Sequence, residues 1–398
     1  MMKRLVVILA IIISTGHADR KLNFKYNPGC TSECSNLLKL AYVRAEGDND
    51  TVHYLFDFTM KPSLVVVTSV KDSVVAIDYE KLKTKGPDNT ISFSNVPIYV
   101  FGTVLNYLYE FNDINDTACL SNNSDIIGMD FKRFNNWNLT KLQNEEDFVQ
   151  VTISANSYRS VGINKTGNVS VTLKVFGKED KGFAFPHLVH TPESGEITLT
   201  LDHLKTANPK SRFAVEILTL SSYPYNFSEK ITKKTFSDDS ASGGVFSSIL
   251  VNAIGEDFEE GGGYLTWKPV VFKAPDTHAL NASSTAQYSI QSHSNAVDWI
   301  STPLFNLFGN ELFNTQSYLM KATNVSFGET GDEFYLKSNY LYWTFLVGVG
   351  APPNDSLGFF EISIIASLLL LLTITMILVF CIFMRWISSK RNSIIYGQ

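Results

Sequence analysis

The chain has 398 residues, a formal net charge of −6 and 18% charged residues, and 44% of its residues are hydrophobic. This mild acidity argues against a nucleic-acid partner, because such a partner is bound by a basic surface. The length exceeds what one hydrophobic core usually holds, so two folded domains are expected.

Residues 1–18 have the pattern of a cleavable secretory signal peptide. Lys3 and Arg4 precede an unbroken apolar run over Leu5–Ile13, and Gly16-His17-Ala18 supplies small residues at the positions that a signal peptidase reads. The apolar run is much shorter than the roughly 20 residues of a membrane-spanning helix, which disfavours an uncleaved anchor. We therefore expect this segment to be removed and the rest of the chain to enter an oxidising compartment.

Residues 19–180 are expected to form a first luminal β domain, because short β-branched and aromatic runs alternate there with turn residues. The nearly continuous apolar run in Leu64–Val70 predicts a central strand that is buried on both faces. Val100–Phe111 is compatible with either a strand or a helix. The other predicted strands are Leu38–Arg44 and Val52–Phe58, which pair as a hairpin across Gly47–Asp50, and Val74–Tyr79, Val149–Ser154 and Val169–Phe176.

Residues 181–358 are expected to form a second luminal β domain. The boundary is placed at the charged segment Gly177–Gly182, which also suits a hairpin loop. Ser237–Gly263 predicts a long connection with a short helix or strand at Val245–Ile254. The predicted strands of this half, several of which alternate apolar and polar residues, are Glu196–Leu201, Phe213–Leu220, Tyr264–Trp267, Ala286–Ser292 and Phe334–Val349. This period of two is typical of a sheet with one solvated face, so we predict an all-β ectodomain of two β-sandwich-like domains.

The C-terminal part of the chain predicts one membrane span and a short tail. Ile362–Met384 contains no charged residue, and at about 1.5 Å per residue a helix of this length covers roughly 34 Å, enough for a hydrocarbon core of about 30 Å. Arg385, Lys390 and Arg391 follow the span, and positive flanks stay cytoplasmic. We therefore expect a single-pass type I protein in membrane lipid, with residues 385–398 as its cytoplasmic tail.

The four cysteines are Cys30, Cys34, Cys119 and Cys381. Cys381 lies in the predicted span and is interpreted as an apolar filler. The other three cannot all pair within one chain: Cys30 bonded to Cys34 closes a tight loop, and a bond from either of them to Cys119 is the alternative. A remaining thiol that pairs between chains would give a homo-oligomer. The spacing of Cys30 and Cys34, with no nearby pair of histidines, does not predict a metal site.

Acceptor motifs for N-linked glycans occur ten times in the chain, always with a middle residue other than proline. The composition predicts roughly five by chance, so the motif is enriched about twofold. Each glycosylated residue must lie at the surface, and several of the motifs fall in turn-like contexts. The predicted acceptors are Asn49, Asn115, Asn122, Asn138, Asn164, Asn168, Asn226, Asn281, Asn324 and Asn354.

The sequence contains no Gly-x-Ser-x-Gly elbow, no His-Glu-x-x-His motif and no P-loop. One group of side chains would suit a metal site or an acid–base site of a hydrolase. It consists of His187 and His190, with Asp202 and His203 a strand away. Prolines bracket the first pair, however, which favours an exposed connector. The acidic run Glu256–Glu260 lacks the spacing of a calcium loop. We therefore predict a protein that is not an enzyme and that needs no cofactor.

The last residues of the tail are incomplete candidates for a sorting signal. A tyrosine-based signal requires a bulky apolar residue three positions after the tyrosine, and the chain stops two residues after Tyr396. A dileucine-type signal requires an acidic residue four positions before its first apolar residue, and Lys390 stands there before Ile394 and Ile395. A solvated stub is the alternative interpretation of this segment.

Several segments together resemble the glycosylated lysosomal membrane protein family. The most specific is the block before the span, where Tyr340-Leu341-Tyr342-Trp343 runs into Leu346–Asn354. The other matching segments are Tyr42–Ala45, Thr51–Tyr54, Ile91–Ser94 and Leu265–Val270. The order of signal peptide, acceptor-rich ectodomain, single span and short tail agrees with the family as well.

The resemblance implies a lysosomal membrane protein that acts as an accessory subunit. It implies a partner, a lysosomal transporter of the major facilitator superfamily associated with dipeptide export, which the subunit binds and protects from luminal proteases. The chain departs from the family in having no cysteine between Cys119 and Cys381 and in lacking a fuller tyrosine-based signal. The partner is therefore an alternative source of the sorting signal. The alternative function, which the β-sandwich pattern and the incomplete tail motivate, is a cell-surface adhesion or receptor glycoprotein.

Overall fold

The computed structural model describes residues 19–31, 34–123, 125–182, 186–223, 226–233, 247–254, 262–277, 279–353 and 359–395. The expected signal peptide, the acceptor Asn354, the acidic run Glu256–Glu260 and Tyr396 lie outside these residues. The chain forms two compact units, one that ends at Pro353 and one that begins at Asn354. The first unit is built almost entirely from strands, whereas the second contains a single long helix, so the predicted class of a β ectodomain with one C-terminal helix is confirmed.

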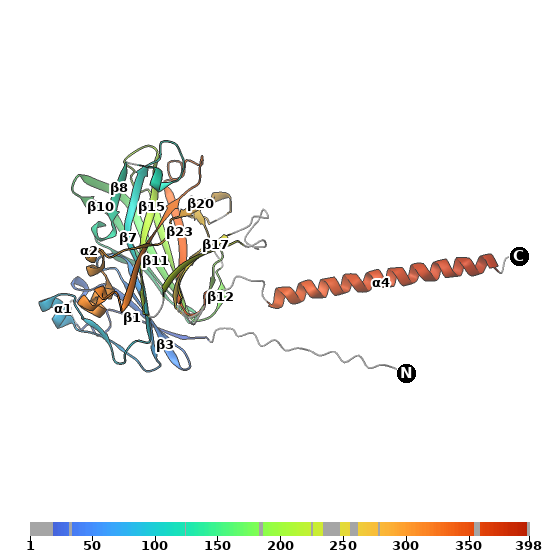
Figure 1. The fold of residues 1–398 in the computed structure, drawn as a ribbon, viewed down its shortest axis with the longest axis horizontal. Coiled ribbons are helices and arrows are strands. Elements are labelled where there is room, and N and C mark those ends of the chain that lie inside the picture. Colours follow the sequence, from blue (N-terminus) through green and yellow to red (C-terminus); the bar gives the residue numbers. More distant parts are fainter. Residues whose placement is uncertain are drawn as a thin grey trace. The chain divides into compact units, whose positions relative to one another are not determined.

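One antiparallel sheet contains strands from the first third of the chain together with four later ones (Figure 1). Its order is β1–β2–β3–β4–β7–β15–β22; β8 shares an edge of β7 with β4, and β20 and β21 pair along β22. The strands are β1 (Lys21–Tyr26), β2 (Leu40–Glu46), β3 (Asp50–Asp57), β4 (Ser63–Val70), β7 (Tyr99–Asn112), β8 (Ile126–Asp130), β15 (Ser211–Ser222), β20 (Ala282–Gln287), β21 (Gln291–Ser292) and β22 (Tyr318–Phe327).

A second antiparallel sheet has the order β9–β10–β11–β14–β23–β18–β17–β16, with β19 beside β18 along β23. β19 also pairs with β20, which joins the two sheets along one side. The strands are β9 (Asn138–Asn144), β10 (Phe148–Ser160), β11 (Ile163–Phe176), β14 (Ser194–Asp202), β16 (Asn226–Lys233), β17 (Ser247–Ile254), β18 (Gly263–Trp267), β19 (Val270–Phe272) and β23 (Tyr340–Val349).

The main core lies between the facing surfaces of the two sheets. Along β11 the alternate residues Val169, Val171, Leu173 and Val175 are all buried, as the period of two predicts. These side chains belong to the same buried cluster as residues of the first sheet such as Phe101. Burial of each such aliphatic side chain contributes roughly 1.5–3 kcal/mol, so this cluster is the chief source of stability of the sandwich.

A second core covers the outer face of the first sheet. Val65 and Val67 of β4 pack there against Trp299 and Leu304, while Leu64 and Val66 face the main core. The prediction of a central strand that is buried on both faces is therefore confirmed. The covering elements are β5 (Val75–Ile77), α1 (Tyr79–Lys85), β6 (Ile91–Phe93), α2 (Ala296–Ile300), α3 (Pro303–Phe308) and the 3₁₀ helix η5 (Gly309–Phe313).

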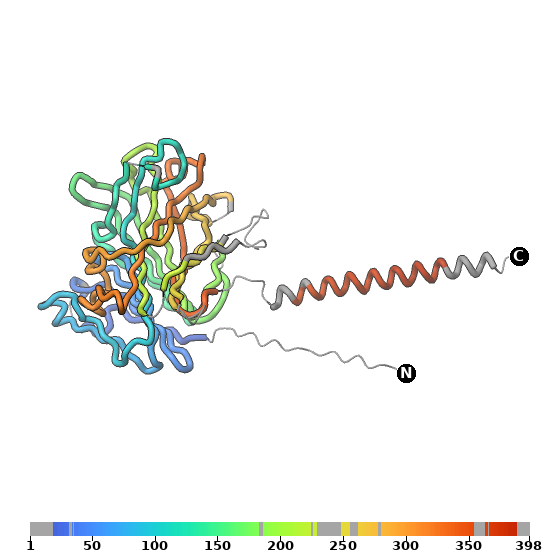
Figure 2. Tube along the Cα trace, in the orientation of Figure 1, coloured from blue at the N-terminus to red at the C-terminus, as the bar shows by residue number. Residues whose placement is uncertain are grey.

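The predicted boundary at residue 180 does not separate two compact units. β14 lies between β11 and β23, and β15 pairs with β7 over Ser211–Ser221, so strands from both sides of the boundary share each sheet. In Figure 2 the late strand β23 accordingly lies among strands from the middle of the chain. Gly177–Gly182 is instead a connection, and its short strand β12 (Asp180–Lys181) pairs with β13 (Val189–His190).

Several predicted strands differ from the observed ones for local reasons. Residues 334–339 are not a strand, because Tyr335 and Asn339 adopt positive φ angles of 75° and 49° that end the extended conformation before β23. Val74–Tyr79 is cut short because the Asp78 side chain accepts a hydrogen bond from Lys81 N at 2.8 Å and caps α1. Val100–Phe111 is a strand, and Val245–Ile254 contains strand β17. The predicted strand Ala286–Ser292 is divided between β20 and β21.

Cys30 and Cys34 form a disulfide bond, which selects the tight loop among the pairings that the sequence allowed. Cys119 lies elsewhere, with its Sγ atom 3.2 Å from Ser121 Oγ. The alternative bond from Cys30 or Cys34 to Cys119 is therefore wrong for this structure.

The helix of the second unit, α4 (Phe359–Ile395), has the length and composition of a membrane span. Its segment Ala366–Ile387 has a mean hydropathy of 2.8, and none of it is buried by the rest of the chain. The hydroxyl of Thr373 donates to Leu370 O, and the hydroxyl of Thr375 donates to Leu372 O, so these polar side chains are satisfied within the helix. The predicted span Ile362–Met384 overlaps this segment closely.

Candidate functional site

The structure places most of the predicted sugar acceptors on the surface of the ectodomain. Asn281 and Asn324 are half-buried. Asn122 lies in the 3₁₀ helix η2 (Leu120–Asn122), and its side chain is outside the described part of the structure. The exposed acceptors are Asn49, Asn115, Asn138, Asn164, Asn168 and Asn226. Surface position is the physical requirement for a glycan, and most of the acceptors meet it without any rearrangement.

The two histidines of the predicted pair, His187 and His190, are held by separate contacts. His190 is buried and stacks on Phe176 with ring centroids 3.4 Å apart, and burial lowers its pKa to about 4. His187 Nδ1 lies 2.8 Å from Gly182 O, and His203 is occupied by an exposed contact to Asp202. Within the described residues no group of three or more His, Cys, Asp or Glu side chains is arranged to hold a metal ion.

The segment around these histidines also differs from the exposed connector that its prolines predict. Lys268 is only 2% exposed, and its ammonium group donates a hydrogen bond to Pro186 O at 2.9 Å. Leu188 and His190 are buried as well. The segment is therefore held in the fold by a buried lysine and by the ring contact to Phe176, neither of which the local sequence reveals.

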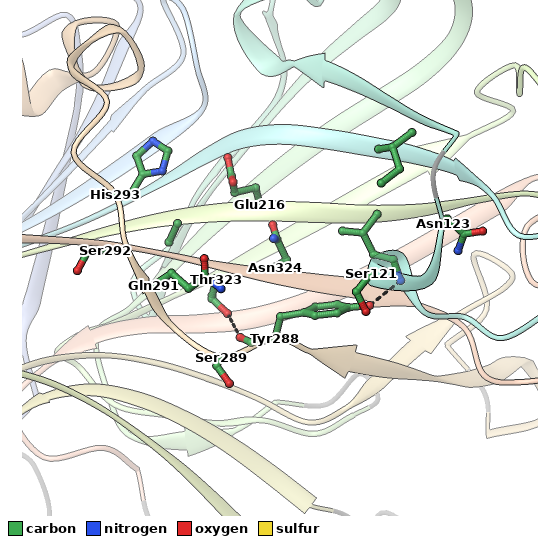
Figure 3. Close-up of a pocket in the computed structure, with 13 residues that line it drawn as sticks. Ser121, Asn123, Glu216, Tyr288, Ser289, Gln291, Ser292, His293, Thr323 and Asn324 are labelled. Atoms are coloured by element: carbon green, nitrogen blue, oxygen red, sulfur yellow. Dashed lines mark hydrogen bonds between the residues drawn. The ribbon is translucent and has the colours of Figure 1, made fainter.

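A polar cavity of about 350 Å³ is present on the outer face of the first sheet (Figure 3). Its floor is formed by β15 and β22, its walls by η2 and the chain that follows β20, and its rim by β21 and the residue after it. The side chains that give it its chemical character are Glu216, Tyr288, Gln291, His293, Thr323 and Asn324.

Two polar residues of the cavity floor lie directly opposite each other, because Glu216 and Asn324 are register partners in the β15–β22 pair. The Glu216 carboxylate accepts hydrogen bonds from Asn106 Nδ2 at 2.5 Å and from the Tyr109 hydroxyl at 3.3 Å. Asn324 Oδ1 is buried and has no hydrogen-bond partner among the described residues. The floor therefore presents one engaged carboxylate and one buried amide oxygen that still lacks a donor.

Tyr288 is fixed against one wall of the cavity by hydrogen bonds of its backbone and of its phenol group. Its N–H donates to Asn324 O at 2.9 Å, and its carbonyl accepts from the Thr323 hydroxyl at 2.7 Å. The phenol oxygen accepts from Leu120 N at 2.6 Å, as the dashed lines in Figure 3 show. These bonds hold the aromatic ring in one orientation beside the floor.

A buried ion-pair network supports the rim. His293 Nε2 lies 3.0 Å from Asp298 Oδ2, and the same carboxylate accepts from Lys61 Nζ at 2.9 Å. Lys61 is only 1% exposed and also bonds to Asn106, which connects this network to Glu216. Burial alone would raise the pKa of Asp298, but the bonds from His293 and Lys61 outweigh it and lower the pKa to about 2.

The ionisable side chains of the cavity are held by hydrogen bonds. Glu216 accepts from two donors, and His293 is bonded to the Asp298 carboxylate. Sequence reasoning singled out Asn324 as a sugar acceptor but missed the cavity, because Glu216, Tyr288 and Asn324 are far apart in the chain. No motif links them; only the pairing of β15 with β22 brings them together.

Two buried histidines predict that acidification weakens the fold. His53 is fully buried between the Tyr42 hydroxyl and Ser69 Oγ, each 2.7 Å from a ring nitrogen, and burial and the charge of Arg44 lower its pKa to about 4. A histidine whose pKa is lower in the folded state is destabilising once the pH falls below its unfolded value of about 6.5. His53 and His190 are each expected to reduce the free energy of unfolding by about 2 kcal/mol between pH 7 and pH 5.

Denaturant unfolding of the full chain in detergent at the two pH values checks this prediction. The variant His53→Gln/His190→Gln should show a smaller difference between pH 7 and pH 5 than the wild-type protein. Asp57→Asn should show a larger one, because burial raises the pKa of Asp57 to about 6, and its protonation therefore stabilises the folded state at acidic pH. Equal pH dependence in all three proteins would contradict the assignment.

Comparisons with known proteins give one consistent result. The family described as glycosylated lysosomal membrane protein matches residues 39–390. The Xenopus laevis protein named glycosylated lysosomal membrane protein B is 27% identical over 377 residues, which cover 91% of this chain and 90% of that protein. The Homo sapiens glycosylated lysosomal membrane protein is 23% identical over 364 residues, with coverage of 88% and 84%. The Danio rerio protein of the same name is 23% identical over 352 residues, with coverage of 85% and 82%.

Proposed function

We propose, from the premise that the chain belongs to the glycosylated lysosomal membrane protein family, that it is a non-enzymatic accessory subunit of a lysosomal transporter. In this proposal the chain crosses the lysosomal membrane once, in type I orientation, with a short cytoplasmic tail. Its glycosylated ectodomain binds a transporter of the major facilitator superfamily, which carries dipeptides, and protects it from luminal proteases.

The observation that carries the proposal is that α4 is apolar and is not covered by other residues of the chain, although the rest of the chain forms a folded β ectodomain. Ala366–Ile387 has no cover from the rest of the chain, so lipid and the helices of a partner are the surfaces against which it can pack. Its threonine hydroxyls bond to carbonyls of their own helix, which leaves an apolar surface for that packing.

The ectodomain has features expected of a protein that persists among proteases. Cleavage of a folded chain requires local opening, and opening is costly where strands are paired and side chains are buried. The buried ion pair Lys165–Glu110, whose side chains are 5% and 1% exposed, joins β11 of the second sheet to β7 of the first. Exposed acceptors such as Asn164 and Asn168 would add glycans to a hairpin end that a protease could otherwise approach.

The contacts of the buried and half-buried histidines support a structural role for these side chains. His53 and His190 are enclosed by neighbouring side chains, and His293 is bonded to Asp298. Each of these groups is occupied by a contact that stabilises the fold. This favours a binding function over the hydrolase that the histidine pair suggested.

Loss of this chain from cells is expected to shorten the half-life of the transporter in lysosomes. Expression of the wild-type chain should restore the half-life, and the two proteins should co-purify in mild detergent. A control chain, in which Ala366–Ile387 is replaced by an unrelated apolar helix of the same length, tests whether α4 contributes to binding. An unchanged half-life together with no co-purification would contradict the proposal. Predominant labelling of the chain at the cell surface would instead favour an adhesion or receptor function.

A further inference from the structure

We propose that the polar cavity on the outer face of the first sheet holds the first sugar of a glycan attached to Asn324. This inference does not depend on the proposed transporter partner. Asn324 belongs to an acceptor motif with Ser326, and its side chain also lines the cavity. A glycan at this position therefore begins inside a preformed cavity, whereas glycans at exposed sites such as Asn164 begin in solvent.

The chemistry of the cavity matches a pyranose that carries hydroxyl and acetamido groups. Glu216 supplies a carboxylate acceptor for sugar hydroxyls, and the buried Asn324 Oδ1 has no donor among the described residues. Gln291 and Ser292 at the rim offer further polar groups. The fixed ring of Tyr288 supplies an apolar surface, against which the C–H groups of a sugar ring can pack.

The size and position of the cavity also fit a sugar. A volume of about 350 Å³ lies at the lower end of the roughly 300–1,000 Å³ range of ligand pockets. The cavity lies between two apolar clusters on the same sheet face, one containing Leu120 and Tyr288 and the other containing Leu218 and Ala322. A bound sugar would fill the polar gap between them and make the covering of this face continuous.

In the folded protein, the acceptor motif of Asn324 is not accessible to a glycosylating enzyme. Ser326 is fully buried, and its hydroxyl donates to Ala118 O at 2.9 Å. The Asn324 backbone carbonyl is also occupied, because it accepts from Tyr288 N. The sugar must therefore be attached before β22 is packed into the sheet, and folding then places it in the cavity.

Site-resolved enzymatic deglycosylation of the full chain tests the proposal. Peptide N-glycosidase converts each released asparagine to aspartate, which takes up ¹⁸O from labelled water and is read by mass spectrometry. In the native protein we expect release at Asn324 to be about tenfold slower, or more, than at Asn164 and Asn168, because the first sugar must leave the cavity before the enzyme can reach its bond to Asn324. After denaturation all occupied sites should be released completely. An Asn324 found without a glycan, or released natively at the rate of the exposed sites, would overturn the proposal.

Thermal unfolding gives a second readout that does not depend on the enzyme. Asn324→Gln and Ser326→Ala both remove the acceptor motif, and both are expected to lower the melting temperature relative to wild type. Ser326→Ala also loses the bond to Ala118, so Asn324→Gln is the cleaner variant. Asn164→Gln is the matched control and should leave the melting temperature unchanged. Equal melting temperatures for wild type and Asn324→Gln would contradict a sugar that is packed in the cavity.

Discussion

Replacement of Arg212 by methionine is expected to lower the free energy of unfolding of the ectodomain by about 3–5 kcal/mol. Arg212 is 2% exposed, and its guanidinium lies 2.8 Å from Asp113 Oδ2 and 2.7 Å from Asp332 Oδ1. It also pairs with Asp116 and donates to Glu329 O at 3.0 Å. One side chain of β15 thus connects the end of β7 to the turn that precedes β23.

The large effect follows from what the substitution leaves behind. Methionine has a similar volume but no charge, so Asp113 and Asp332 would remain buried without their cation. Urea unfolding followed by tryptophan fluorescence measures the change. The exposed pair Lys178–Asp147, with side chains 44% and 59% exposed, provides the control. Lys178→Met should change the free energy by less than about 1 kcal/mol, and a similar loss in both variants would argue against a buried-charge origin.

Trp343→Ala is expected to destabilise the ectodomain by about 3–5 kcal/mol through the cavity that it creates. Trp343 is fully buried in β23 and contacts Trp267 edge-on, with ring centroids 6.0 Å apart. It also lies 5.5 Å from the ring of Phe327 and 4.8 Å from that of Phe345. Its ring therefore fills space at the centre of the main core, between the two sheets.

Trp343→Phe tests whether the loss of stability follows the volume that is removed. The indole N–H of Trp343 has no hydrogen-bond partner among the described residues, so phenylalanine removes a buried donor that is already unsatisfied. Phenylalanine keeps one aromatic ring and leaves a smaller cavity than alanine, so the Phe variant should lose clearly less stability than the Ala variant. Equal losses in both variants would contradict a cavity as the origin of the effect.

Much of the strand content could be predicted because alternation is a local property. The valines and leucine of β11 occupy every second position, and that spacing alone places them on one face. The order of strands in the sheets is not local: β14 lies between β11 and β23, which is more than 130 residues further along the chain. The two-domain prediction failed for this reason, since the charged segment at Gly177–Gly182 resembles a linker.

The candidate site was harder to predict than the fold. An Asn-x-Ser motif states that Asn324 can accept a sugar, but exposure depends on which strands lie beside it. β22 was not predicted as a strand, so its register with β15 and the proximity of Glu216 were inaccessible to sequence reasoning. The short helices α2 and α3 were missed as well. Their apolar residues pack against the outer face of the first sheet, and the sequence did not reveal where that face lies.

Both outermost strands of the second sheet begin at a sugar acceptor. β9 starts at Asn138 and pairs only with β10 among the described strands, and β16 starts at Asn226 and pairs only with β17. A strand with an unpaired edge can recruit the edge of another molecule, which is a route to self-association. A glycan attached to Asn138 or Asn226 would stand at the start of one of these edges and would obstruct such pairing.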